Sequence, residues 1–445
     1  MKKMLAVLLA VLMVLSMVAC SNGGEKEAEG SDGKIKLVVP KIGYTDEQIK
    51  NAQKTREEDS KEMGKEMPFS EEYRVSTMLM ERVKEKYPEY DVSWEDWGWA
   101  ESLDQKQRSS ITAGTQVDIL VGETFMPTYA NEGVLEPLPQ DIIDMCNPSL
   151  LLYGTDGKAY GVADKSSVFM LFWNKDLVAQ AGLDPEVAPK TWDEFAEMSA
   201  KVTAAGNGEF YGGGIPSFPH AGGALRATPF FRMNGTDFAT SDGQSNLNDP
   251  ALQEVLQYVR DMDANFPKGL ANATDEGPLW KAFEKDRTLA YVINGSWQAV
   301  NSDRLEMNWG VAPLPTKDGK TAGNCLVGSV IMGVNAKSEH KEEAFNILRL
   351  CLEEERQKIW VEANCVVPLK AVLENESLFE GNTTMQTAVA AVTESTTSGL
   401  AVFAKNDSQV WSIIDQQVLA RTTMTQDDIA TICADADKQI QPLLK

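Results

Sequence analysis

The sequence contains only two histidines, and it lacks the short motifs of most hydrolases and nucleotide-binding enzymes. His220 and His340 lie far apart and no HExxH pair is present, which excludes most zinc hydrolases. There is neither a GxSxG nucleophile elbow nor a GxxxxGK[ST] phosphate-binding loop. Carboxylates are plentiful, so the acidic pair of a glycoside hydrolase is not excluded, although no spacing selects one. We therefore expect a protein that is not an enzyme, without a metal or a cofactor.

Basic residues are also in short supply, because 42 lysines and arginines stand against 66 aspartates and glutamates, for a formal net charge of −24. A protein that binds nucleic acid needs a basic face for the phosphates, so this composition argues against that class. None of the six cysteines forms a CxxC pair, which leaves no sign of a zinc ribbon or a redox motif. We interpret Cys351 as a core residue of its helix, and the spacing does not support a bridge to Cys365.

The amino terminus has the composition of a targeting segment. Two lysines precede an almost wholly apolar run (4–18), which is too short for a membrane-spanning helix. The run ends in MVAC, which is similar to the lipobox of bacterial lipoproteins, whose cysteine, here Cys20, carries lipid. We predict a signal peptide over 1–19, a lipid anchor on Cys20 as the only membrane attachment, and a flexible polar tether over 20–33. Ordinary signal-peptidase cleavage near Ala19 is the alternative.

The stretch from 160 to 202 carries the clearest local signals. The aromatic-rich apolar run VFMLFW (168–173) predicts a buried strand, and a short helix follows that ends at Gly182. Thr191 and Glu194 form a capping box at the start of the next helix. The apolar face of that helix consists of Trp192, Phe195, Met198 and Val202.

The order of the predicted elements indicates an α/β fold. At 445 residues the chain is too long for one ordinary core, so we expect two domains. Strands predicted at 34–40, 91–94 and 117–121 alternate with helices, which indicates parallel strand pairing. Residues 45–72 are highly charged without an apolar period, and we interpret them as an exposed insertion, either a loop or a helix. We expect the Gly-rich stretch 211–231 to form a loop around a pocket.

Three segments have a pattern that is shared with a known family. They read YGVA…WNKDLV…AGLDP…PKTWDEF (160–195), DILVGE…YANEGVLEPL and SVIMGVNAKSEHKEEAFNIL. Together they resemble the extracellular solute-binding proteins of sugar ABC transporters, the group that includes the maltose-binding proteins. The resemblance extends from Lys34 to the end of the chain, apart from the charged insertion. Ala163 replaces the proline that is usual in the family, and Trp173 replaces the usual tyrosine.

This resemblance implies a periplasmic-binding-protein-like α/β fold, in which two lobes joined by a hinge of several chain crossings enclose the ligand. One lobe would comprise 34–164 and 308–338, and the other 165–307 and 339–445. Clefts between domains are common sites for small ligands. The resemblance also implies a monomer at the outer face of the cell membrane, which closes over a sugar and delivers it to an ABC permease.

Tryptophans are the first candidates for the binding site, because a sugar presents apolar C–H faces as well as hydroxyls. Trp297 resembles the stacking tryptophan of the family's second lobe, and Trp411 lies where maltose-binding relatives carry another. Trp97 and Trp99 follow the second predicted strand, and we expect one of them to face the cleft. The alternative for each of these tryptophans is a structural role in the hydrophobic core, because large aromatic side chains are usually buried. We assign Trp192 to packing.

Polar candidates lie where predicted strands end, because parallel strands present ligand contacts at their carboxyl ends. Glu123 and Arg226 are the strongest, since a carboxylate accepts hydrogen bonds from sugar hydroxyls and an arginine donates to them. The other polar candidates are Tyr44, Asp164, His220 and Ser329. Each of them has a solvated or structural role as the alternative.

We therefore predict a lipid-anchored binding protein that delivers a carbohydrate, with an oligosaccharide as the first expectation, to an ABC importer. The expected partners are this ligand and the permease, and nucleic acid is not among them. Two alternatives stay open. In the first, the same scaffold binds another polar ligand, such as a polyol phosphate or a peptide. In the second, the protein is a surface glycoside hydrolase.

Overall fold

The structure is a computed structural model, and it describes residues 33–274, 276–319, 327–394 and 399–445. The predicted signal peptide (1–19), the lipid anchor on Cys20 and all of the predicted tether except Gly33 lie outside the described residues. No helix in the described part of the chain is long and apolar enough to cross a membrane.

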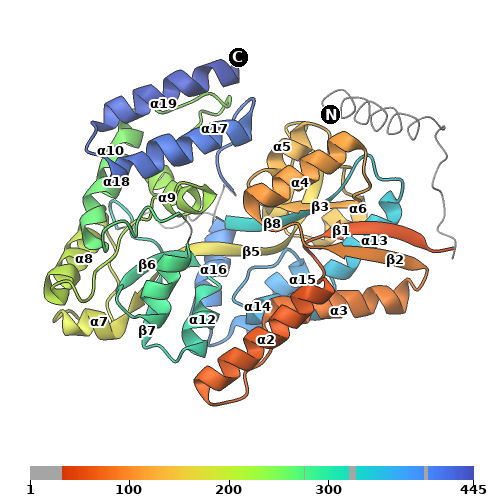
Figure 1. Cartoon of the computed structure of the whole chain (residues 1–445), viewed down its shortest axis with the longest axis horizontal. Coiled ribbons are helices and arrows are strands. Elements are labelled where there is room, and N and C mark those ends of the chain that lie inside the picture. The colour runs from red at the N-terminus through yellow and green to blue at the C-terminus, as the bar shows by residue number, and fades with distance from the viewer. Residues whose placement is uncertain (1–32, 275, 320–326, 395–398) are drawn as a thin grey trace, which may run out of the picture.

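Strand β5 (Ala159–Asn174) connects the two halves of the molecule, which lie on the left and right of Figure 1. Its first part pairs antiparallel with β4 (Leu151–Tyr153) and β8 (Val327–Val334) on the right. Its second part pairs antiparallel with β6 (Tyr291–Gly295) and β7 (Trp309–Ala312) on the left. The predicted two-lobed α/β architecture is confirmed, and the predicted buried run 168–173 belongs to the second part of this shared strand.

The right half is built on β1 (Ile35–Pro40), β2 (Tyr90–Glu95) and β3 (Ile119–Gly122). The expected parallel pairing holds for β1 with β2, but it is wrong for the larger sheet, in which β3 pairs antiparallel with β8. The reason is that β8 returns the chain from the left half, so it runs against both of its neighbours, β3 and β5. Sequence order alone does not show this return.

Helices cover the strands of the right half. They are α3 (Glu71–Lys86), α4 (Ala100–Ala113), α5 (Met126–Asn131), α6 (Gln140–Met145), α13 (Lys341–Cys351), α14 (Glu354–Glu362) and α15 (Lys370–Leu373). Ser70 caps α3, whose inward face includes Val75, Leu79 and Val83, as the apolar spacing predicts. The charged insertion was predicted to be an exposed loop or helix, and it contains helix α2 (Asp46–Met63), which has no buried residue.

The left half contains mostly helices. They are α7 (Lys175–Gln180), α8 (Trp192–Gly206), α9 (Ala221–Met233), α10 (Pro250–Met262), α11 (Gly277–Trp280), α12 (Gln298–Arg304), α17 (Asp407–Ile413), α18 (Arg421–Met424) and α19 (Ile429–Leu444). Two π-helical stretches, Lys281–Lys285 and Ile414–Ala420, continue α11 and α17. Helix α16 (Thr383–Glu394) packs on β5 and β7. The predicted capping box of Thr191 and Glu194 is present at the start of α8.

The Gly-rich stretch 211–231 is only partly the loop that the sequence suggested, because its second part is the start of α9. Gly223 explains this difference. A Cβ atom at this position would lie 2.5 Å from the carbonyl oxygen of Phe218, so glycine lets the first turn of the helix approach the preceding chain closely. The glycines therefore serve close packing as well as the loop.

The predicted lobe boundaries stay a prediction. Helix α13, which the prediction placed in the second lobe, contributes Ala344 and Ile347 to the same buried cluster as Leu37 and Val39 of β1. The four cysteines that the structure describes are buried and unbridged, and they include Cys351 on the inner face of α13. This agrees with Cys351 as a core residue.

Candidate functional site

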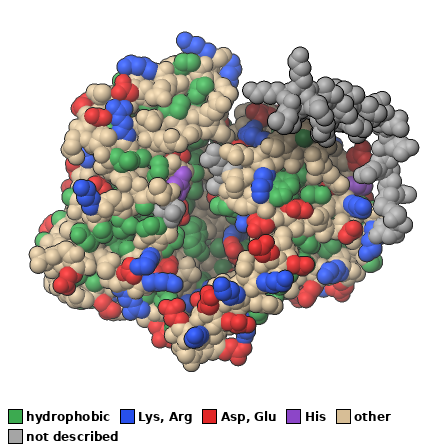
Figure 2. Space-filling view, viewed as in Figure 1, with side chains coloured by type: hydrophobic (Ala, Val, Ile, Leu, Met, Phe, Trp, Pro, Cys, Tyr) green, Lys and Arg blue, Asp and Glu red, His purple; other side chains and the backbone are tan. Residues whose placement is uncertain are grey.

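A cavity of about 600 Å³ lies between the two halves, where Figure 2 shows the surface hollowed. Both halves and the shared strand β5 contribute to its walls. Among the lining residues are Lys41, Tyr44, Glu71, Glu72, Trp99 and Glu123 from the right half, Asp164, Lys165 and Phe169 from β5, and Arg226, Glu276, Trp297, Asn301 and Arg304 from the left half. A cavity with this placement is the natural ligand site of a two-lobed protein.

The structure brings six of the sequence candidates together in this cavity. They are Tyr44, Trp99, Glu123, Asp164, Arg226 and Trp297. These positions are far apart in the sequence, and they meet because β1, β3, β5 and β6 all end or bend beside the space between the halves.

The remaining candidates lie away from the cavity walls. Trp411 is 6% exposed, packs edge-on against Phe238 and Phe403, and donates from Nε1 to the Ala401 carbonyl. His220 caps α9, because its Nδ1 accepts a hydrogen bond from the Gly222 amide. The two others are Trp97, which packs against a buried cluster, and Ser329, whose hydroxyl bonds that of Ser166 at 2.7 Å.

Trp297 stands at the start of α12 and forms part of the cavity wall in the left half. Its ring meets Phe169 edge-on, with the ring centroids 5.9 Å apart. A Cβ atom at Gly295 would lie 1.9 Å from the Trp297 ring, so glycine at this position is what allows the indole to fold back over the end of β6. The close approach of the indole therefore explains why glycine stands two positions before Trp297.

Arg226 is almost fully buried, and its N–H donors are already engaged within the protein. It pairs with both carboxylate oxygens of Glu276, at 2.9 and 3.2 Å, and donates to the backbone of Gly222 and Ile293 and to the side chain of Asn294. Its guanidinium also lies 4.8 Å from the centre of the Trp280 ring. Arg226 therefore positions a second residue, and the group it presents to the cavity is the Glu276 carboxylate.

Asp164 and Arg356 form a second buried pair behind the cavity. The side chains are 9% and 1% exposed, and both carboxylate oxygens face the guanidinium. Arg356 also donates to the carbonyls of Val75 and Cys351, which ties α3 and α13 to β5. We call this pair, together with Arg226 and Glu276, the inner wall.

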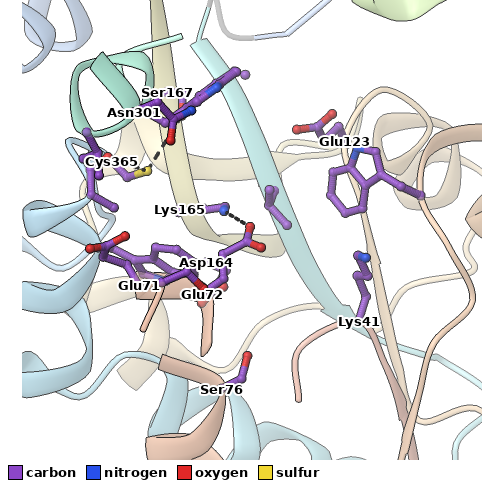
Figure 3. A pocket seen from close by; sticks show the side chains of 18 of the residues that line it. Lys41, Glu71, Glu72, Ser76, Glu123, Asp164, Lys165, Ser167, Asn301 and Cys365 are labelled. Carbon is purple, nitrogen blue, oxygen red and sulfur yellow. Dashed lines mark hydrogen bonds and ion pairs between the residues drawn. The ribbon is translucent and has the colours of Figure 1, made fainter. Parts of the chain in front are cut away.

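Two further ion pairs line the cavity nearer to solvent. Lys165 contacts Glu72 at 2.7 Å, as Figure 3 shows, and its ammonium lies 4.1 Å from the centre of the Trp360 ring. The attraction of Lys165 holds the pKa of Glu72 below its ordinary value. Arg304 contacts both oxygens of Glu71, at 2.9 and 2.7 Å. The outer wall comprises Lys165, Glu72, Arg304 and Glu71 together with Lys41 and Trp99.

Lys41 and Glu123 are the two charged residues of the cavity that have no ion pair among the residues that the structure describes. Lys41 lies 5.5 Å from the centre of the Trp99 ring, and Trp99 is 39% exposed. Burial raises the pKa of Glu123 to about 7, with Lys165 and Arg226 opposing that rise and Glu276 adding to it. Figure 3 shows Lys41 and Glu123 on the side of the cavity opposite Cys365.

Sequence reasoning missed Glu276, Arg304 and Glu72, although all of them line the cavity. Glu276 precedes α11 and Arg304 ends α12, and neither position carries a local motif. Their partners are Arg226 and Glu71, which are 50 and 233 positions away along the chain. Only the fold shows these pairings. No group of acidic, histidine and cysteine side chains suited to a metal ion is found in the described residues.

An α/β molecule in two halves, with a polar and aromatic cavity between them, belongs to the class of two-lobed binding proteins. The profile of the family named bacterial extracellular solute-binding protein matches residues 68–358, which is more than half of the chain. The protein therefore belongs to this family.

Individual relatives are distant. A putative binding protein of Brucella abortus is 28% identical over 303 residues, which cover 62% of this chain and 69% of the relative. An sn-glycerol-3-phosphate-binding periplasmic protein of Pectobacterium atrosepticum is 29% identical over 199 residues, covering 42% of this chain and 43% of the relative. The structure of T. maritima MalE3 with maltose bound superimposes with a TM-score of 0.72 at 20% identity, covering 92% and 100% of the two chains, which shows a common fold.

Proposed function

We propose that this solute-binding protein binds a neutral carbohydrate, with an oligosaccharide as the first expectation, and releases it to an ABC permease. The observation that supports this proposal is the composition of the cavity. Trp99 and Trp297 offer apolar ring surface from the two halves, and paired carboxylates offer hydrogen-bond acceptors between them. This combination suits a molecule with apolar C–H faces and a surrounding ring of hydroxyls.

The charge balance of the cavity favours a neutral ligand over an anionic one. Each positive side chain except Lys41 has a carboxylate partner among the described residues, so Lys41 is the one cation of the described cavity lining that lacks an ion pair. A phosphate needs several free N–H donors or cations, and the donors of Arg226 are already used. The cavity therefore has little unsatisfied positive charge for a phosphate.

A polyol phosphate is the second candidate ligand. The relative from Pectobacterium atrosepticum is named for sn-glycerol 3-phosphate, and Lys41 is a cation at the cavity wall without an ion pair in the described part of the chain. One lysine supplies a single point charge, so we expect weaker binding of this ligand than of a neutral saccharide.

Hydrolysis of the ligand is the third candidate, and the state of the carboxylates argues against it. A glycoside hydrolase needs two carboxyl groups that both face the scissile bond, one of them holding a proton. Glu71, Glu72 and Glu276 each contact a cation, so they act as fixed acceptors, while Glu123 has the raised pKa of an acid. Glu123 therefore has no second free carboxylate beside it that could complete a hydrolase pair. We propose that the ligand is bound without being cleaved.

The targeting features belong to the same proposal. We propose cleavage after residue 19, lipidation of Cys20, a tether over 20–33 and a monomer at the outer face of the cell membrane. Mass spectrometry of protein from the membrane fraction would test the anchor, because a diacylglycerol on Cys20 adds a defined mass.

Tryptophan fluorescence and calorimetric titration against neutral oligosaccharides, sn-glycerol 3-phosphate and short peptides would test the proposed ligand class. We expect saturable binding of at least one neutral saccharide, and no release of new reducing ends on prolonged incubation. Binding of the phosphate alone would replace the proposed ligand, and new reducing ends would show an enzyme instead.

A further inference from the structure

The charged insertion (residues 45–72), called the arm below, has a structural role that the family match does not account for. The family profile begins at residue 68, so α2 lies outside it. Figure 1 shows α2 running beneath the space between the halves, close to α12 of the left half. The arm thus belongs to the right half in sequence and reaches toward the left half in space.

The arm is a firmly attached element despite its exposure. Thr45 and Gln48 form a capping box at the start of α2, and Gly64 ends the helix in the left-handed conformation. Farther along α2, Arg56 donates from Nε to the Met67 carbonyl at 2.9 Å and stacks on the Phe69 ring. These contacts fold the linker back on α2, so the arm holds a defined position without burying any residue of the helix.

The same arm forms part of the cavity. Gln48 from its first turn lines the cavity, as do Ser70, Glu71 and Glu72 from its end. Glu72 contacts Lys165 of β5, the strand that the two halves share. A movement of the arm therefore changes the space that is available to a ligand.

Two ion pairs connect the arm to α12 and to the residues that follow it. Arg304 contacts both carboxylate oxygens of Glu71, and these side chains are 27% and 15% exposed. Lys65 contacts Glu306 at 2.5 Å, and these side chains are 52% and 66% exposed. Val300 and Asn301 of α12 line the same cavity, so both pairs connect the arm to a helix that forms the opposite wall.

We propose that the arm is an electrostatic clasp that holds α12 against the right half and slows the release of a bound ligand. Because a contact between the halves has to break before the cavity opens, its strength acts on the dissociation rate. The Glu71–Arg304 pair carries most of this effect, since it is shielded from water, whereas the Lys65–Glu306 pair is open to solvent and to screening by salt. The effect on ligand release rests on the proposed function, but the clasp itself is present without ligand.

Charge reversal and restoration provide the test. Arg304→Glu should speed dissociation of a bound saccharide about tenfold at low ionic strength, and the double variant Glu71→Arg/Arg304→Glu should recover most of the loss. The wild-type dissociation rate should rise with salt, whereas the excess rate of Arg304→Glu over wild type should shrink, because salt screens the repulsion between Glu71 and the new carboxylate. A wild-type rate and salt response in Arg304→Glu would overturn the proposal.

A second pair of variants separates the clasp from direct contact with the ligand. Lys65 and Glu306 do not line the cavity, so Lys65→Glu acts through the arm alone, and Lys65→Glu/Glu306→Lys restores the pair. We expect a small rise in dissociation rate for the single variant and recovery in the double variant. Arg82→Glu is the matched control, because Arg82 pairs with Glu353 and Glu355 away from the cavity. An equal effect of Arg82→Glu would mean a general charge effect and would contradict the clasp.

Small-angle X-ray scattering of the ligand-free protein tests the clasp even if no saccharide binds. Arg304→Glu should enlarge the radius of gyration relative to wild type, and the double variant with Glu71→Arg should reverse this. Unfolding curves that match wild type would show that the variants are folded. Equal dimensions for all folded variants would overturn the clasp, whereas failure to bind any saccharide would overturn only the proposed function.

Discussion

The inner and outer walls of the cavity use the same residue types in different surroundings. In the inner wall, the side chains of Arg356 and Asp164 are 1% and 9% exposed, and backbone carbonyls satisfy the remaining donors of Arg356. In the outer wall, Arg304 and Glu71 are 27% and 15% exposed, and they join two separate parts of the chain. Burial makes a charge costly to leave unpaired, so we expect loss of an inner-wall charge to lower stability and loss of an outer-wall charge to act mainly on ligand binding and release.

The largest expected effect is in the inner wall. Arg356→Met leaves the Asp164 carboxylate buried without its counter-charge, and it should lower the free energy of unfolding by ~3–5 kcal/mol. Chemical denaturation would measure this, and Arg356→Met/Asp164→Asn should recover part of the loss because no charge is then stranded. Arg82→Met, which breaks exposed ion pairs on α3, should stay near wild type. Equal stability of Arg356→Met and Arg82→Met would remove the distinction between the walls.

The second prediction compares two tryptophans of the cavity. Trp297→Ala should weaken saccharide binding by ~2 kcal/mol, about thirtyfold, because Trp297 is a partly buried plate beside Phe169. Trp99→Ala in the outer wall should lose less, since Trp99 is already 39% exposed. Calorimetric titration would measure both changes. Trp411→Phe is the control, which should lower stability and leave affinity unchanged, and the opposite order for Trp297 and Trp99 would contradict the comparison.

The third prediction concerns pH. Ligand hydroxyls that donate to Glu123 favour its ionised form, so affinity should rise as the pH increases through about 7, where burial places the pKa of this carboxyl. Glu123→Gln should flatten that profile. The ligand-free protein should behave oppositely. Because the folded-state pKa lies above the unfolded value, stability should fall as the pH rises from about 4.5 to about 7 and then stay level for this group.

Ligand titrations below and above pH 7 check the predicted rise in affinity, and denaturation curves over the same range check the predicted fall in stability. The charged groups that act on Glu123 are Lys165, Glu276 and Arg226. Lys165→Gln should move the midpoint of the affinity profile upward, since it removes a positive charge. A profile that is the same for wild type and Glu123→Gln would exclude Glu123 as a ligand acceptor.

The smallest expected effect is that of Lys65→Ala in the arm. This pair is largely exposed, so its equilibrium contribution is small and is reduced further by salt. We expect affinity indistinguishable from wild type at physiological ionic strength, and a slightly faster dissociation when salt is low. A loss in affinity comparable to that of Trp297→Ala would show that the outer wall contributes far more binding energy than its exposure suggests.

Local signals in the sequence predicted much of the fold. The capping box at Thr191, the buried run 168–173 and the exposure of the insertion 45–72 are all present as expected. Such features depend on residues within a few positions of one another, which is why they can be read from one sequence. The antiparallel return of β8 and the helix that begins within the Gly-rich stretch depend on distant neighbours, and the sequence misled us there.

The site was less accessible to sequence reasoning, as two arginines and two tryptophans show. Arg226 reads as a ligand donor, but its donors are taken by groups up to 68 positions away, and Arg304 has no motif at all. Trp297 immediately precedes α12 and Trp411 lies within α17, yet Trp297 lines the cavity whereas Trp411 packs between Phe238 and Phe403. Residue type predicts the chemistry of a side chain, whereas the fold decides whether that chemistry faces a ligand.

Strand β5 has a consequence for how the molecule unfolds. Val168 lies opposite Val327 in one half, and the next residue, Phe169, lies opposite Gly295 in the other. Unfolding of either half therefore breaks hydrogen bonds of β5 directly beside those that hold the strand in the other half. Because β5 belongs to the sheets of both halves, we expect the two halves to melt together, with a single calorimetric transition.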